Sequence, residues 1–484
     1  MNLAFMNGRR FFSAVRAITK MHRWLAIISD LHISDGMLDD FDDELETQLI
    51  EFLDWFGNLH GPAELVLNGD FLDFVQASPW EGSALEDEAI DGTPLCFTQA
   101  QSLEKLANIE RAHPRTLDAL KQFLASQSHR LTILPGNHDP DFFWPAVRSR
   151  IIGRLGLHAD SNRIHFCLDR GYRPAGLEWL LIEHGHRYDK VNSFRVNGHE
   201  RWSIDEPPIL AARNGDHRLV ECVGTRFLIR FLNGLDARYP YVDNVKPFSR
   251  FLRIFGASAL TPGWAPLDAA IAVTKMLGYV THTAFTRSDD LLGIDPPANV
   301  GPSNPLVRWI RSATDPERNE LARRLQDSGF ALDTSLDFLA DDPAAIAPLL
   351  DHLAREPALV ANLGEHDQAL LGTEPGTLSL KEAYSINETE DLYDGAANAA
   401  IGGINTAVMG HTHEPFQRAQ HGLTYFNTGS WTRYYRFAKE EPSRPWRILQ
   451  QRSYETFPYS LRYVLVKPGE MTATMELWRE RARE

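Results

Sequence analysis

Side chains able to bind metal ions occur in short groups along this 484-residue chain. Carboxylate oxygens, amide oxygens and neutral imidazoles are the ligands that hard or borderline divalent metals prefer. No cysteine belongs to these groups, which argues against a structural zinc site. Seven ligands are too many for one ion, but they suit two ions that share one carboxylate. The candidate ligands are Asp30, His32, Asp70, Asn137, His184, His411 and His413.

Such a pair of ions would carry out one kind of chemistry. Two neighbouring metals polarise a phosphoryl group and lower the pKa of a bridging water, so that a hydroxide nucleophile forms at neutral pH. The sequence therefore points towards hydrolysis of a phosphate ester or anhydride.

Short apolar runs precede these polar groups and are typical of buried strands. In open α/β sheets, ligand sites lie beyond the carboxyl ends of the strands. Helical spacing of apolar residues at 42–58 and 101–124 separates the first strands. We therefore predict an α/β core with metal-binding loops at one edge. The predicted strands cover residues 24–29, 64–67, 131–134, 179–182 and 406–409.

The chain divides into four predicted segments. Residues 1–22 form a basic extension, or Met21 is the working start. Residues 23–190 are the first part of the core, and 401–484 are the second part, which ends in strands with hairpin character. Between them, 191–400 contain no comparable strand followed by ligands, and much of this segment has helical spacing. We therefore predict an inserted, mainly helical cap.

Five motifs in this order resemble those of the calcineurin-like metallophosphoesterase superfamily. The resemblance covers roughly 23–190 and 400–480, and it implies a four-layer α/β/β/α sandwich with a binuclear metal centre. The motifs are Asp30-x-His32, Gly69-Asp70-x-x-Asp73, Gly136-Asn137-His138-Asp139, His184 and Gly410-His411-x-His413.

The resemblance also implies a role for each motif residue. Asp30, His32, Asp70 and His413 would hold the first metal. Asp70 would bridge to the second, which Asn137, His184 and His411 would complete. His138 would be the general acid that protonates the leaving group, and Asp73 would orient His138. The expected cofactors are two divalent ions, Mn²⁺ first, with Fe and Zn as rivals.

Two departures bear on the substrate. Many phosphatases of the superfamily have an arginine that contacts phosphate directly after the second motif, where this chain has Phe74. The fourth motif reads His184-Gly185-His186, where the UDP-2,3-diacylglucosamine pyrophosphatases of the superfamily have HGD. Residues 184–189 and 427–431 nevertheless resemble that bacterial branch.

Charge is unevenly distributed along the chain. Lys and Arg total 49 against 65 Asp and Glu, a net charge of −16, which weighs against general coating of nucleic acid. Residues 225–260 contain six bases, two acids and seven aromatics. This stretch could form an amphipathic cap helix, contact a membrane surface or bind single-stranded nucleic acid. Residues 333–394 are strongly acidic and are predicted to form a solvated helical face.

We therefore expect a metallophosphoesterase acting on a small phosphoester, a nucleotide-linked pyrophosphate or a lipid-linked phosphate. The alternatives are a nuclease or phosphodiesterase acting on DNA or RNA, and a non-catalytic, metal-containing binding or scaffold protein. Three cysteines and no long uncharged apolar stretch predict a cytoplasmic location. The sequence does not predict an oligomeric state.

Overall fold

The computed structural model describes most of the predicted core and parts of the insert. Residues 1–22 and 267–280 lie outside the described residues, as do most of 225–260 and all of 333–387. No helix in the described part of the chain is long and apolar enough to cross a membrane. The described residues are 23–38, 41–80, 97–189, 191–196, 199–211, 216–222, 224–225, 228–229, 233, 245–246, 315–330, 388–400, 403–436 and 457–481.

The larger sheet has six strands in the order β16-β15-β1-β2-β3-β4. Strands β1 to β4 are parallel, whereas β15 runs antiparallel to β1 and β16 runs antiparallel to β15. The first strand is therefore an inner strand, with a neighbour from the far end of the chain. The bounds are β1 Trp24–Ile28, β2 Ala63–Asn68, β3 Arg130–Leu134, β4 Ile164–Phe166, β15 Tyr459–Val466 and β16 Thr474–Arg481.

The smaller sheet has four strands in the order β12-β13-β11-β5. Strand β11 is parallel to both neighbours, and β12 is antiparallel to β13. In this sheet, β5 precedes the predicted insert in the chain, whereas the other three strands follow it. The bounds are β5 Leu180–Ile182, β11 Thr406–Met409, β12 Phe416–Gln420 and β13 Leu423–Asn427.

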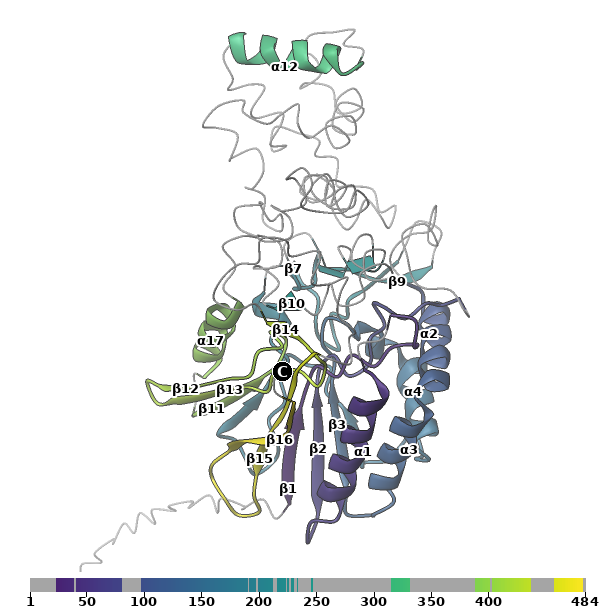
Figure 1. Ribbon diagram of the computed structural model, residues 1–484, viewed down its shortest axis with the longest axis vertical. Coiled ribbons are helices and arrows are strands. Elements are labelled where there is room, and N and C mark those ends of the chain that lie inside the picture. The colour runs from purple at the N-terminus through teal and green to yellow at the C-terminus, as the bar shows by residue number, and fades with distance from the viewer. Residues whose placement is uncertain are drawn as a thin grey trace, which may run out of the picture.

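Helices and the two sheets stack in layers (Figure 1), and three apolar clusters hold them together. One cluster packs the helices against the outer face of the larger sheet, through residues such as Phe52 and Leu65. A second lies between the sheets, where Ile27 and Val66 meet Ile182 and Val408. The third packs α17 on the smaller sheet. The α/β/β/α order confirms the predicted fold class. The helix bounds are α1 Asp43–Gly57, α2 Gln99–Ala112, α3 Pro114–Phe123, α4 Pro145–Arg154 and α17 Glu388–Ala399.

Local sequence explains where the first helices begin and end. The Asp42 side chain accepts a hydrogen bond from the Leu45 amide and caps α1, which has three acids in its first turn. The helical stretch predicted over 101–124 forms two helices. The break falls at His113 because the following Pro114 disfavours helical backbone in the residue before it.

The described parts of 191–400 include short strands as well as helices. Strand β10 pairs with β14 of the second core segment, and Phe194 and Trp202 belong to the apolar cluster under the larger sheet. The boundaries of the four segments stay predictions. The elements are β6 Arg195–Val196, β7 His199–Glu200, β8 Ile209–Ala211, β9 His217–Leu219, β10 Val245–Lys246, α12 Asp315–Asp327 and, after the insert, β14 Tyr435–Arg436.

Candidate metal centre

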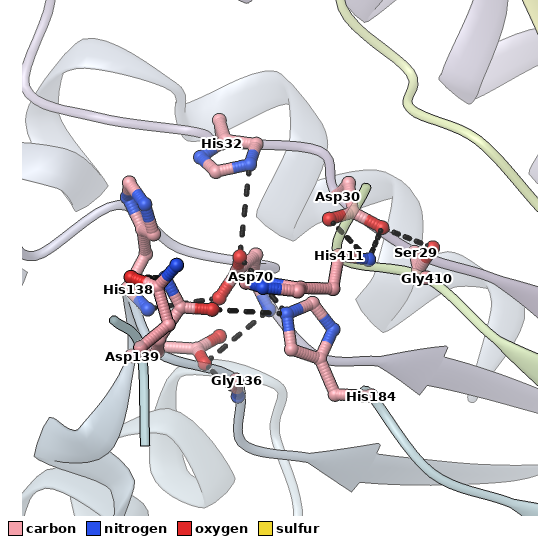
Figure 2. A network of polar contacts seen from close by, with 12 residues as sticks. Ser29, Asp30, His32, Asp70, Gly136, His138, Asp139, His184, Gly410 and His411 are labelled. Carbon is pink, nitrogen blue, oxygen red and sulfur yellow. Dashed lines mark hydrogen bonds and ion pairs between the residues drawn. The ribbon is translucent and has the colours of Figure 1, made fainter. Parts of the chain in front are cut away.

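The predicted ligands meet where parallel strands end. In the larger sheet, β1, β2 and β3 end side by side and lead into the loops of Asp30, Asp70 and Asn137. In the smaller sheet, β5 and β11 end side by side and lead into His184 and His411. Because the two sheets pack face to face, these loops converge (Figure 2).

The backbone at these loops is unusual. Six non-glycine residues in the described part of the chain have a positive φ, and five of them are predicted ligands. Left-handed backbone costs a residue with a side chain about 1–3 kcal/mol and tends to occur at functional sites. The fold therefore accepts strain at these positions to direct their side chains inward. The five are Asp30, His32, Asp70, His411 and His413, with φ between 49° and 72°.

The first group of candidate ligands consists of Asp30, His32, Asp70 and His413, which bring one ligand atom each within 4.8 Å of the others. The Nε2 atoms of His32 and His413 lie 3.0 Å apart, and His413 Nε2 lies 3.4 Å from Asp30 Oδ1. Asp30 and Asp70 are almost completely buried. These donors therefore converge on one small volume.

The second group consists of Asp70, His184 and His411. His184 Nε2 lies 3.0 Å from Asp70 Oδ2 and 3.3 Å from Asn137 Oδ1, which brings Asn137 into the same group. Asp70 belongs to both groups and lies between them, as the predicted bridging ligand must (Figure 2).

Electrostatics show that this site fits cations. Burial lowers the pKa of His184, but the nearby charges of Asp70 and Asp30 outweigh it and raise that pKa to about 10. Buried carboxylates surrounded by imidazole nitrogens need positive charge between them. Oxygen and imidazole donors without thiolate suit Mn²⁺, Fe or Zn. The residues present therefore fit two divalent ions.

Asp73 connects the metal ligands to the predicted general acid. Its Oδ2 lies 2.7 Å from His138 Nδ1 and 2.9 Å from His32 Nδ1, and its Oδ1 accepts hydrogen bonds from the amides of Val75 and Gln76. Burial raises the pKa of Asp73, but the charges and hydrogen bonds of the two histidines hold it well below its usual range. A single carboxylate therefore orients both rings and leaves their Nε2 atoms for metal and substrate.

Comparison with known proteins adds an independent finding. Residues 24–236 match the model of the calcineurin-like phosphoesterase family. The matched residues therefore form part of a calcineurin-like phosphoesterase domain. This confirms the predicted superfamily, whereas the resemblance to the UDP-2,3-diacylglucosamine branch stays a prediction. A search of the curated proteins found no match.

The matched range of the phosphoesterase domain ends before the last pair of candidate ligands. His411 and His413 lie beyond residue 236, yet β11 returns to the smaller sheet beside β5 and delivers both to the site. The structure thus brings together all seven predicted metal ligands, with His138 and Asp73 beside them. That these side chains bind metal stays a prediction.

Asp139, which we did not assign a chemical role, braces two loops of the candidate site. Its buried carboxylate accepts hydrogen bonds from the amides of Gly136 and Phe71, and the His138 amide donates to Asp70 Oδ1 at 2.8 Å. A Cβ atom at Gly136 would collide with Asp70 and His184. This glycine therefore lets the third motif approach the second.

The turn after β13 braces Asp30 in a way that the sequence did not predict. Ser29 Oγ donates to Asp30 Oδ2 and lies 2.6 Å from Thr428 Oγ1. The amide of His411 also donates to Asp30, at 3.0 Å. The signal in the sequence was the resemblance of residues 427–431 to the UDP-2,3-diacylglucosamine branch.

Two further buried groups lie near the site. His186 is 3% exposed, and neither ring nitrogen has a hydrogen-bond partner within the described residues; its ring packs against Trp202. Lys105 donates to the Phe74 carbonyl at 2.7 Å and lies over the Phe97 ring. Lys105 is therefore used inside the core and does not replace the arginine that is absent at position 74.

Proposed function

We propose that this chain hydrolyses a phosphoester or pyrophosphate bond in a small, nucleotide-linked or lipid-linked substrate. The observation that carries the proposal is the convergence of six oxygen and imidazole donors, from both sheets, around the shared carboxylate of Asp70. The family match to a phosphoesterase domain supports the same reaction class.

Two divalent ions bound by these donors would supply Lewis-acid activation of water and of the phosphoryl group. The rest of the reaction depends on the chain's own side chains. His138 donates a proton from Nε2 to the leaving oxygen as the P–O bond breaks. Asp73 accepts the Nδ1–H of His138, which fixes the tautomer and supports the imidazolium form.

The first test compares substrates and one bridging-ligand variant. Mn²⁺-loaded protein is incubated with p-nitrophenyl phosphate, its bis-p-nitrophenyl diester and a nucleotide-linked pyrophosphate. Asp70→Asn is expected to abolish turnover of every substrate because it weakens both candidate metal sites. Asp118→Asn is the matched control, since Asp118 is exposed and forms an ion pair with Arg154.

The outcomes separate the reaction classes. Turnover lost in Asp70→Asn and kept in Asp118→Asn supports the proposal, and the preferred substrate identifies the bond that is cleaved. Preference for the diester would direct further tests to DNA and RNA. A wild-type protein that binds Mn²⁺ but hydrolyses none of these substrates would contradict the proposal and favour a non-catalytic binding protein.

A further inference from the structure

Asp189 and Asn192, two residues of one turn, contact two of the candidate ligands in the second group. Asp189 follows the 3₁₀ turn His186–Tyr188 and is 3% exposed. Its Oδ2 lies 3.1 Å from His411 Nε2. A histidine that donates Nε2–H to a carboxylate keeps Nδ1 as the nitrogen available to a metal. Asp189 thus selects the tautomer and the ring orientation of His411.

Asn192, in the same turn, selects the orientation of a second candidate ligand. Asn192 Nδ2 donates to Asp189 Oδ2 at 2.6 Å, which leaves Asn192 Oδ1 as an acceptor. Asn137 Nδ2 donates to that oxygen at 3.5 Å. An amide binds a metal through its oxygen. Because Asn137 Nδ2 is directed to Asn192, its Oδ1 faces His184 at 3.3 Å.

The turn is itself fixed in place. The Val191 amide donates to Asp189 Oδ1 at 2.8 Å, and the Val191 carbonyl accepts from Gly224 at 2.9 Å. His411 follows a strand of the smaller sheet and Asn137 follows a strand of the larger one. The turn therefore connects ligands from the two sheets, whereas the first group is braced elsewhere, by Asp73 at His32.

We infer that Asp189 and Asn192 are positioning residues for the second ion: they orient His411 and Asn137, and so set its affinity without setting that of the first. The inference rests on the metal site of the proposed function. It does not depend on which substrate is hydrolysed, because its prediction concerns binding of the metal alone.

The test measures metal binding by the full-length chain. Metal-free wild type, Asp189→Ala, Asp189→Asn and Asn192→Ala are titrated with Mn²⁺ by calorimetry, and electron paramagnetic resonance distinguishes a coupled pair of ions from an isolated one. Loss of such a supporting contact typically weakens metal affinity about 10–100-fold. We expect this loss of affinity for the second ion alone. The loss should be smaller in Asp189→Asn, because asparagine keeps an acceptor oxygen.

The matched control is Glu64→Gln. Glu64 is a buried acid that contacts Thr132 of β3 and the Tyr172 hydroxyl, and it lies early in β2, away from the strand's carboxyl end. This variant should bind both ions like the wild type. In Asp189→Ala and Asn192→Ala, the coupled signal should be replaced by that of an isolated ion when two equivalents are present.

Binding of both ions with wild-type affinity by Asn192→Ala and Asp189→Ala would overturn the inference. Equal loss of affinity for both ions in Asn192→Ala would also overturn the inference. Asn192 is partly exposed, so this variant carries the least risk to the fold. A wild type that takes up only one ion would overturn it as well. Two bound ions without turnover would instead contradict the proposed function and leave the inference standing.

Discussion

At the scale of single residues, the site depends on carboxylates that each do more than one task. Asp70 belongs to both groups of candidate ligands, and Asp73 bonds both His32 and His138. A change in one carboxylate therefore affects metal binding and proton transfer together. Changes in His32 and His138 should separate metal binding from proton transfer, because each ring has one proposed role.

His138→Ala should lower kcat by about 10²–10⁴-fold, the usual contribution of a positioned general acid. The loss should be smaller for a p-nitrophenyl ester than for an alkyl ester, because p-nitrophenolate leaves without a proton. Stopped assays with both esters measure this difference. His158→Ala, at an exposed position on the surface, is the control. Equal losses with both esters would argue against protonation of the leaving group by His138.

Binding of the second ion should release a proton. With a pKa raised to about 10 by Asp70 and Asp30 against the effect of burial, metal-free His184 is protonated at neutral pH. A ligating imidazole must be neutral, so the proton competes with the metal and apparent affinity rises with pH. Calorimetry with Mn²⁺ in buffers of different ionisation enthalpy measures the release. Heats that do not depend on the buffer would contradict the prediction.

At the scale of secondary-structure elements, the loops that follow the strands must lie very close to one another at the site. A side chain at Gly136 would collide with Asp70 and His184, whereas a Cβ atom at Gly153 in α4 would meet no other atom within 4 Å. Gly136→Ala should therefore lose Mn²⁺ binding. Gly153→Ala should keep it and gain about 0.5–1 kcal/mol of unfolding free energy. Mn²⁺ titration and denaturant unfolding of both variants check this pair.

Helix α1 is tied to the last part of the chain by a buried arginine. The Arg433 guanidinium is fully buried and pairs with Asp42 and Glu44 at the start of α1, and it also donates to the Phe457 carbonyl at 3.0 Å. Arg433→Ala leaves these groups without their partner and should cost about 1–3 kcal/mol of unfolding free energy. Arg479→Ala, half-exposed with a 3.9 Å ion pair, should cost little. If Arg433→Ala and Arg479→Ala unfold at the same urea concentration, the expectation is wrong.

The sequence predicted those elements whose determinants are adjacent in the chain, and missed features that depend on contacts between distant residues. Apolar runs that end in Asp, Asn or His marked β1, β2, β3, β5 and β11 because a strand and its ligand are adjacent in the chain. Pro114 was a local signal for the break before α3, but the apolar spacing over 101–124 ran through it. The turn holding Asp189 and Asn192 carried no apolar pattern, and its role depends on residues from distant strands.

At the scale of the whole molecule, two separated segments build one α/β/β/α core. The larger sheet places β15 beside β1, and the smaller places β11 beside β5. No sequence pattern indicated these neighbours, since any of several strand orders satisfies the same apolar runs. Face-to-face packing of the sheets then brings His411 and His413 to Asp30 and Asp70.

The position of β1 between β2 and β15 has a consequence for synthesis on the ribosome. Leu25 and Ile27 pair with Val466 and Val464, which are made much later than β1. At about 5–20 residues per second, the ribosome needs roughly 20–90 s to make the intervening chain. During that time the edge of β1 is open and its apolar face lacks most of the opposing sheet. We therefore expect the nascent chain to expose an unpaired, apolar edge at β1 until residues 459–466 have been made.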